Sequence, residues 1–240
     1  MKRIVCVIGT VASAAFLLAP AKGADRSKED AANRKTMHDY AKCVVQSNRN
    51  IASEAIVSNA DNSTILKRFP TLINNDCLGR VAGNVSMRFG GDLYRYALAD
   101  ALVNIDFVMS GERDFTNRLP LAHLLAPSQS DLEAALADTK NKRKRQELQK
   151  SFDKKVGVVW LSRYGECVVR RDPSKARLWL LTPPGVPEEI SRINELQPAF
   201  NTCLGEGTLK FNRVTMRGTV AINYYRLAVA TVQSVAGKTQ

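Results

Sequence analysis

The sequence predicts a mainly α-helical protein of two tandem helical repeats, each clamped by one disulfide, with a helical connection between them. Three observations lead to this prediction. A cysteine-containing motif occurs twice, a second cysteine motif follows each copy at nearly the same distance, and the apolar residues around both motifs recur at helical spacing.

The first 23 residues have the features of a secretory signal peptide. Lys2 and Arg3 precede an apolar run at residues 4–19, and the small-residue pattern Ala21-Lys22-Gly23 follows it. We therefore expect cleavage before Ala24 and export to the periplasm. The apolar run is near the lower length limit for a membrane span, and no later stretch reaches the roughly 20 apolar residues that a membrane helix needs. The sequence thus predicts no membrane span in the mature chain.

Two short cysteine motifs each occur twice in the same order. Tyr40-Ala-Lys-Cys43-Val-Val recurs as Tyr164-Gly-Glu-Cys167-Val-Val, and Cys77-Leu-Gly recurs as Cys203-Leu-Gly. Further along, Met87-Arg88-Phe89 matches Leu209-Lys210-Phe211, and Arg95 then matches Arg217. We interpret these matches as an internal duplication.

The duplication divides the chain into segments. We predict a signal peptide at 1–23, a frayed start at 24–35, helical repeat 1 at 36–106, a connection with a basic helix at 107–156, helical repeat 2 at 157–232 and a tail at 233–240.

Four cysteines remain after export, and they allow three disulfide pairings. The duplication favours the pairing that treats both repeats alike, Cys43 with Cys77 and Cys167 with Cys203. Each bond would stabilise the folded state by about 3–4 kcal/mol, because it restricts a loop of this length in the unfolded chain. No CxxC pair is present, so we expect a structural role and not thiol–disulfide exchange.

The equivalent arginines Arg95 and Arg217 lie in segments with apolar helical spacing. Two roles are open for them. Each arginine could bind helix-end carbonyls or a carboxylate within its own repeat, or the pair could face one cleft and bind an anion in a bidentate manner. The structural role is the favoured one.

The connection contains a run of basic residues within a predicted helix that extends from 131 toward 150. Five of the six residues from Lys140 to Arg145 are basic, and no aromatic side chain interrupts them. Such a run is more often a solvated helix face than a binding site. Lys142, Arg143, Lys144 and Arg145 are nevertheless the candidates for binding an anionic component or a protein partner, together with Arg95 and Arg217.

Residues that would indicate an enzyme are scarce. The only histidines are His38 and His123, without metal-ligand spacing around them, and the sequence has no nucleophile-elbow or phosphate-loop motif. We therefore predict no catalytic residues, no metal site and no cofactor. A cleft that gathers two carboxylates, or a carboxylate with His38 or His123, would favour hydrolysis instead.

The Cys-Val-Val segment, the Cys-Leu-Gly motif, the Leu/Met-basic-Phe piece and the closing arginine-containing helix resemble uncharacterised exported proteins of Alphaproteobacteria, of the sphingomonad kind. The resemblance covers both repeats and implies a periplasmic location, but it carries no known activity. The full chain has a formal net charge of +12, and loss of the three cations and no acid in the signal leaves +9. We expect a non-catalytic binding or structural module for an anionic envelope component or a protein, with no nucleic-acid partner; the alternative is a hydrolase of an envelope polymer.

Overall fold

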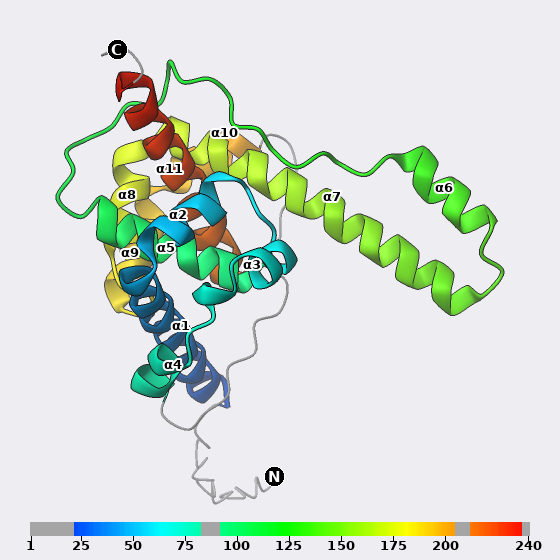
Figure 1. Ribbon diagram of the computed structural model, residues 1–240, viewed down its shortest axis with the longest axis horizontal. Coiled ribbons are helices and arrows are strands. Elements are labelled where there is room, and N and C mark those ends of the chain that lie inside the picture. The colour runs from blue at the N-terminus through cyan, green and yellow to red at the C-terminus, as the bar shows by residue number, and fades with distance from the viewer. Residues whose placement is uncertain (1–21, 83–91, 205–211, 237–240) are drawn as a thin grey trace, which may run out of the picture.

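The computed structural model describes residues 22–82, 92–204 and 212–236, and within them the protein is helical with no β-strand (Figure 1). A 3₁₀ turn at Pro70–Leu72 lies between the third and fourth helices. The α-helices are α1 (Lys22–Ser47), α2 (Arg49–Val57), α3 (Asn62–Arg68), α4 (Asn75–Ala82), α5 (Leu93–Asp106), α6 (Gln129–Ala137), α7 (Lys142–Arg171), α8 (Pro173–Leu181), α9 (Pro187–Glu195), α10 (Gln197–Leu204) and α11 (Arg213–Ala236).

The order of helices repeats, which confirms the predicted fold class. Helices α1 and α7 carry the first cysteine of each repeat, α4 and α10 carry the second, and α5 and α11 carry the equivalent arginines. The disulfides are Cys43–Cys77 and Cys167–Cys203, as the duplication predicted. Two such bonds indicate an oxidising, extracytoplasmic compartment.

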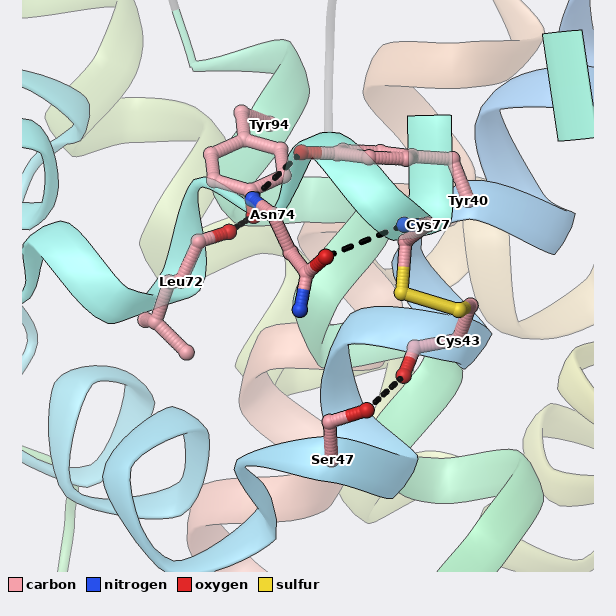
Figure 2. Close-up of a disulfide and its surroundings, with 7 residues drawn as sticks. All are labelled: Tyr40, Cys43, Ser47, Leu72, Asn74, Cys77 and Tyr94. Atoms are coloured by element: carbon pink, nitrogen blue, oxygen red, sulfur yellow. Dashed lines mark hydrogen bonds between the residues drawn. A yellow bond between two sulfur atoms is a disulfide. The ribbon is translucent and has the colours of Figure 1, made fainter. Parts of the chain in front are cut away.

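The surroundings of the two disulfides are also equivalent. In the first repeat, the Tyr40 hydroxyl accepts a hydrogen bond from the backbone N–H of Asn74 at 3.2 Å, next to the Cys43–Cys77 bond (Figure 2). In the second repeat, the Tyr164 hydroxyl donates to the carbonyl oxygen of Phe200 at 3.3 Å. Each tyrosine precedes its cysteine by three residues, and each partner precedes the second cysteine by three, so equivalent positions are linked in both repeats, although the hydroxyl accepts in the first and donates in the second.

The two repeats share one hydrophobic core. Helices α5 and α11 pack against each other more extensively than any other pair among the described residues, and buried residues of both repeats form a single cluster around them. The contact is close at Gly218 of α11, where a Cβ atom would collide with the side chain of Tyr96 in α5. Neither repeat is therefore a separate domain.

Helix starts that the sequence indicates are present. The Asp172 side chain accepts a hydrogen bond from the backbone N–H of Lys175 at 3.0 Å, and Pro173 occupies the first turn of α8. Pro187 likewise begins α9. These two short helices bring polar residues of the second repeat to the core.

The structure differs from the predicted boundaries in three places. Residues 24–35 were predicted to be frayed, but α1 is helical from Lys22 and its Arg34 is buried, since that side chain forms ion pairs in the interior. The single helix expected from 131 toward 150 is divided into α6 and α7, because Asn141 caps a new helix with its side chain. Helix α11 continues to Ala236, beyond the predicted start of the tail at 233.

Some predictions concern residues outside the described part of the chain. They include most of the signal peptide, the matched Met87–Phe89 and Leu209–Phe211 pieces and the last four residues. Among the helices that the structure describes, none combines the length and the apolar character needed to cross a bilayer.

Replacing Cys167 and Cys203 by serine should lower the free energy of unfolding by about 3–4 kcal/mol, because the unfolded chain gains the freedom of a 36-residue separation. Because both repeats share one core, denaturation should remain a single transition. Chemical denaturation followed by circular dichroism measures both quantities. Separate transitions for the two repeats would contradict the shared core.

Candidate functional site

A network of buried ionic groups lies where α1, α5, α9 and α11 meet. Its centre is Arg217, whose Nε donates to Asp100 Oδ1 at 3.0 Å across the α5–α11 contact. The same guanidinium donates to the carbonyl oxygens of Trp179 and Leu180 at the end of α8, at 3.1 and 2.7 Å. Arg217 thus binds helix-end carbonyls of its own repeat, but its carboxylate partner Asp100 belongs to the other repeat, whereas the prediction placed that partner within the same one.

Asp100 is the shared partner of Arg217 and His38. His38 Nδ1 lies 2.8 Å from the second oxygen of Asp100, and the carboxylate accepts the hydrogen bond. Burial alone would raise the pKa of Asp100, but the charge of Arg217 and the hydrogen bond from His38 outweigh burial and lower it. The carboxylate is thus held in its charged form inside the protein.

Glu189 supplies the second buried carboxylate of this network. One of its oxygens accepts from Arg34 Nη1 at 2.6 Å and from the backbone N–H of Gly185 at 2.9 Å, and the other lies 3.5 Å from Arg217. Gly185 has a φ of +88°, and a Cβ there would lie 3.0 Å from the carbonyl oxygen of Ala31 in α1. Glycine therefore allows the tight turn that places Glu189 against α1.

Arg95 lies in a separate pocket from Arg217, so the two equivalent arginines do not face one cleft. Its Nη2 donates to Asn59 Oδ1 near the end of α2, but no carboxylate among the described residues lies within ion-pair distance. Its Nε is buried and has no hydrogen-bond partner within the part of the chain that the structure describes. Burial lowers the pKa of Arg95, and the more distant carboxylates of Asp92 and Asp61 oppose this effect only in part.

His123 belongs to a second polar cluster, between the connection and α7. Its Nε2 lies 2.5 Å from Glu166 Oε2, and its Nδ1 lies 2.8 Å from Ser162 Oγ. Glu166 also accepts from Arg170 at 2.7 Å and from the backbone N–H of Leu121 at 3.1 Å. Serine, histidine and carboxylate are thus in contact, although the same bonds fasten the connection to α7.

The predicted basic residues lie on a helical hairpin that projects from the body of the protein (Figure 1). We call α6 and residues 142–155 of α7 the basic hairpin. Its Leu132 is buried but lies outside the main core cluster, while Leu136, Leu148 and Phe152 are partly buried. The hairpin therefore has a small apolar cluster that is separate from the main core.

The cations of the basic hairpin differ in their partners. Arg145 donates to the carbonyl oxygens of Leu136 and Thr139 at the end of α6, and Arg143 pairs with Glu147 at 3.1 Å. Within the part of the chain that the structure describes, five exposed lysines of the hairpin form no ion pair, and these are Lys142, Lys144, Lys150, Lys154 and Lys155.

The described residues contain no group of three or more histidine, cysteine or acidic side chains that could hold a metal ion. Asp100, Glu166 and Glu189 were not predicted as site residues, although Glu166 lies within the repeated motif and directly precedes Cys167. Their long-range partners could not be derived from spacing along the chain.

Comparison of the chain with protein-family models, with curated proteins and with solved structures finds no match.

Replacing Arg217 by methionine should lower the free energy of unfolding by about 3–5 kcal/mol, because it leaves Asp100 buried without its cation. Arg95→Met is the matched control at the equivalent position of the other repeat. This change leaves no carboxylate unpaired and removes a buried cation that has no ion-pair partner among the described residues, so we expect the free energy of unfolding to stay within about 1 kcal/mol of the parent or to rise. Chemical denaturation of both variants measures the difference, and equal losses would show that Arg95 also has an internal counter-ion.

Proposed function

We propose that this protein is an exported, periplasmic binding module that uses the basic hairpin to hold the anionic surface of a membrane. Export would occur through the predicted signal peptide at residues 1–23. The observation that carries the proposal is the position of the unpaired lysines, on a projection that stands away from the main core.

The charge of the hairpin supports an anionic partner. Residues 129–155, which include α6, contain eight basic and five acidic side chains, and the eight basic ones are exposed and lie within residues 140–155, where only two of the acids occur. Lysines that are not used in internal ion pairs keep their attraction for an external anion, whereas Arg145 is occupied by the end of α6. A surface of anionic lipid headgroups attracts each nearby lysine by about 1 kcal/mol.

The shape of the hairpin supports an extended partner. Helix α7 has 30 residues, which corresponds to a length of about 45 Å, and its cations are distributed over several turns. A single small anion could contact only a few of them. A charged surface can contact many lysines at once, and the sum of weak attractions then gives useful affinity.

Vesicle binding tests this function. The protein should bind vesicles of phosphatidylglycerol and not of phosphatidylcholine, and binding should weaken when salt rises from about 50 to about 300 mM, because salt screens exposed charges. Changing Lys142, Lys144, Lys150 and Lys154 to glutamine should lower the partition coefficient roughly a hundredfold or more, since each lysine contributes about 1 kcal/mol. Co-sedimentation measures the coefficient.

A variant with the same charge change on the body is the matched control. Lys42, Lys67, Arg80 and Arg171 are exposed and form no ion pair among the described residues, so their change to glutamine should reduce binding far less. Equal losses in the two variants, or equal binding to both kinds of vesicle, would refute the role of the hairpin.

A hydrolase is the second candidate function, and the contact of Ser162, His123 and Glu166 is the observation that favours it. In such an enzyme His123 would remove the proton of the Ser162 hydroxyl, and Glu166 would orient the ring. Glu166 also binds Arg170 and the backbone of Leu121, which is why we rank this function below binding.

A fluorophosphonate probe separates the two functions. Binding alone predicts no adduct on Ser162, since the structural cluster then holds the serine without activating it. Hydrolysis predicts an adduct on Ser162 that disappears in His123→Gln. Mass spectrometry of the labelled peptides gives the result, with Ser151, an exposed serine of the same helix, as the internal control.

A further inference from the structure

The two pockets that contain the equivalent arginines are related by the internal duplication. When Cys43 is aligned with Cys167, Arg34 corresponds to Val158 and His38 to Ser162. Arg34 and His38 line the pocket of Arg217, while Val158 and Ser162 line the pocket of Arg95. The same helix positions thus form both pockets.

The closing helices of the repeats show the same relation. When Arg95 is aligned with Arg217, Ala97 corresponds to Thr219 and Asp100 to Ile222. Ala97 and Asp100 line the Arg217 pocket, and their counterparts line the Arg95 pocket. Equivalent positions of the two repeats therefore surround Arg217 and Arg95, but the side chains at these positions differ.

The differences remove the internal counter-ion of Arg95. Asp100 neutralises Arg217, but the equivalent position beside Arg95 is Ile222, which cannot carry charge. His38, which donates to Asp100, is replaced by Ser162. A cation thus remains in a pocket from which its carboxylate is missing.

Two residues that line the Arg95 pocket carry buried polar atoms that indicate the kind of ligand. Arg95 Nε can donate a hydrogen bond and Asn223 Oδ1 can accept one, and neither atom has a partner among the residues that the structure describes. The orientation of the Asn223 amide is fixed because its Nδ2 donates to the carbonyl oxygens of Ser162 and Thr219, at 3.0 and 2.9 Å. The Thr219 hydroxyl is also buried and forms no regular hydrogen bond among the described residues, although the Tyr96 hydroxyl lies near it.

A second buried cation adds positive charge near this pocket. Arg226 donates to the carbonyl oxygen of Ala122, and its buried Nη1 has no partner among the described residues. Its pKa is lowered first by burial and then by the charge of Arg95, against the opposing effect of Glu166. Two arginines thus repel each other across the interior, and an anion between or beside them would relieve this repulsion.

We propose that the Arg95 pocket binds inorganic phosphate as its hydrogen phosphate ion. The oxygens of this ion accept from Arg95 and Thr219, and its remaining hydroxyl donates to Asn223 Oδ1. Sulfate has no proton to donate at neutral pH and would face the Asn223 oxygen unfavourably. The pocket is small, which suits a compact ion and not a large ligand.

Isothermal titration with inorganic phosphate at pH 7.5 and constant ionic strength tests the site. One ion should bind per chain, and sulfate should bind at least tenfold more weakly. Phosphate at ten times its dissociation constant should raise the melting temperature by about 3 °C. Glycerol 3-phosphate is the second ligand, and its largely deprotonated phosphate should also bind more weakly at this pH.

Ile222→Asp restores the carboxylate of the other repeat and should reduce phosphate affinity at least tenfold, with Ile222→Asn as the neutral control of similar size. Arg95→Met should abolish binding. The four-lysine hairpin variant should bind phosphate normally, which separates this site from the membrane function. The proposal would be overturned if no binding were detected at about 20 mM phosphate, which is 20-fold above a dissociation constant of about 1 mM. Equal affinity for sulfate, or unchanged phosphate affinity in Arg95→Met, would also overturn it.

Discussion

The close packing of α5 against α11 determines the rest of the structure. Each helix is the last of its repeat, so their contact converts two similar units into one core. Gly218 permits the approach because it leaves room for the ring of Tyr96. This approach also brings Asp100 of one repeat to Arg217 of the other, so the buried ion pair depends on the packing and at the same time fixes its register.

The duplication produced a symmetric frame with asymmetric chemistry. The disulfides, the tyrosines beside them and the positions of the arginines are alike in both repeats. The side chains around the arginines are not. Around Arg217 a carboxylate of the other repeat pairs with the guanidinium, whereas around Arg95 an isoleucine takes that position and no described carboxylate lies within ion-pair distance. Natural interiors rarely retain an unpaired charge without a reason, so the asymmetry is the more informative part of the pattern.

The frame could be predicted from the sequence, but most of the chemistry could not. Repeated motifs were sufficient for the disulfide pairing and the helical class, because both depend on local pattern and on the duplication. The alignment even marked Arg95 and Arg217 as equivalent. Their partners lie far along the chain, such as Asp100 for Arg217, and only packing brings them together. Residues 24–35 were misjudged for a related reason, since the interior ion pair of Arg34 with Glu189 is not visible in local hydrophobicity.

The disulfides explain how the fold can tolerate an unsatisfied cation. A buried arginine without a counter-ion lowers the free energy of unfolding, and this free energy is small for a protein of this size. Two covalent links of about 3–4 kcal/mol each restrict the unfolded chain and offset this cost without filling the pocket. The stability supplied by the disulfides is therefore consistent with a buried cation that lacks an ion-pair partner. The rule that buried charges are paired is broken at the Arg95 pocket, where an anionic ligand would supply the missing partner.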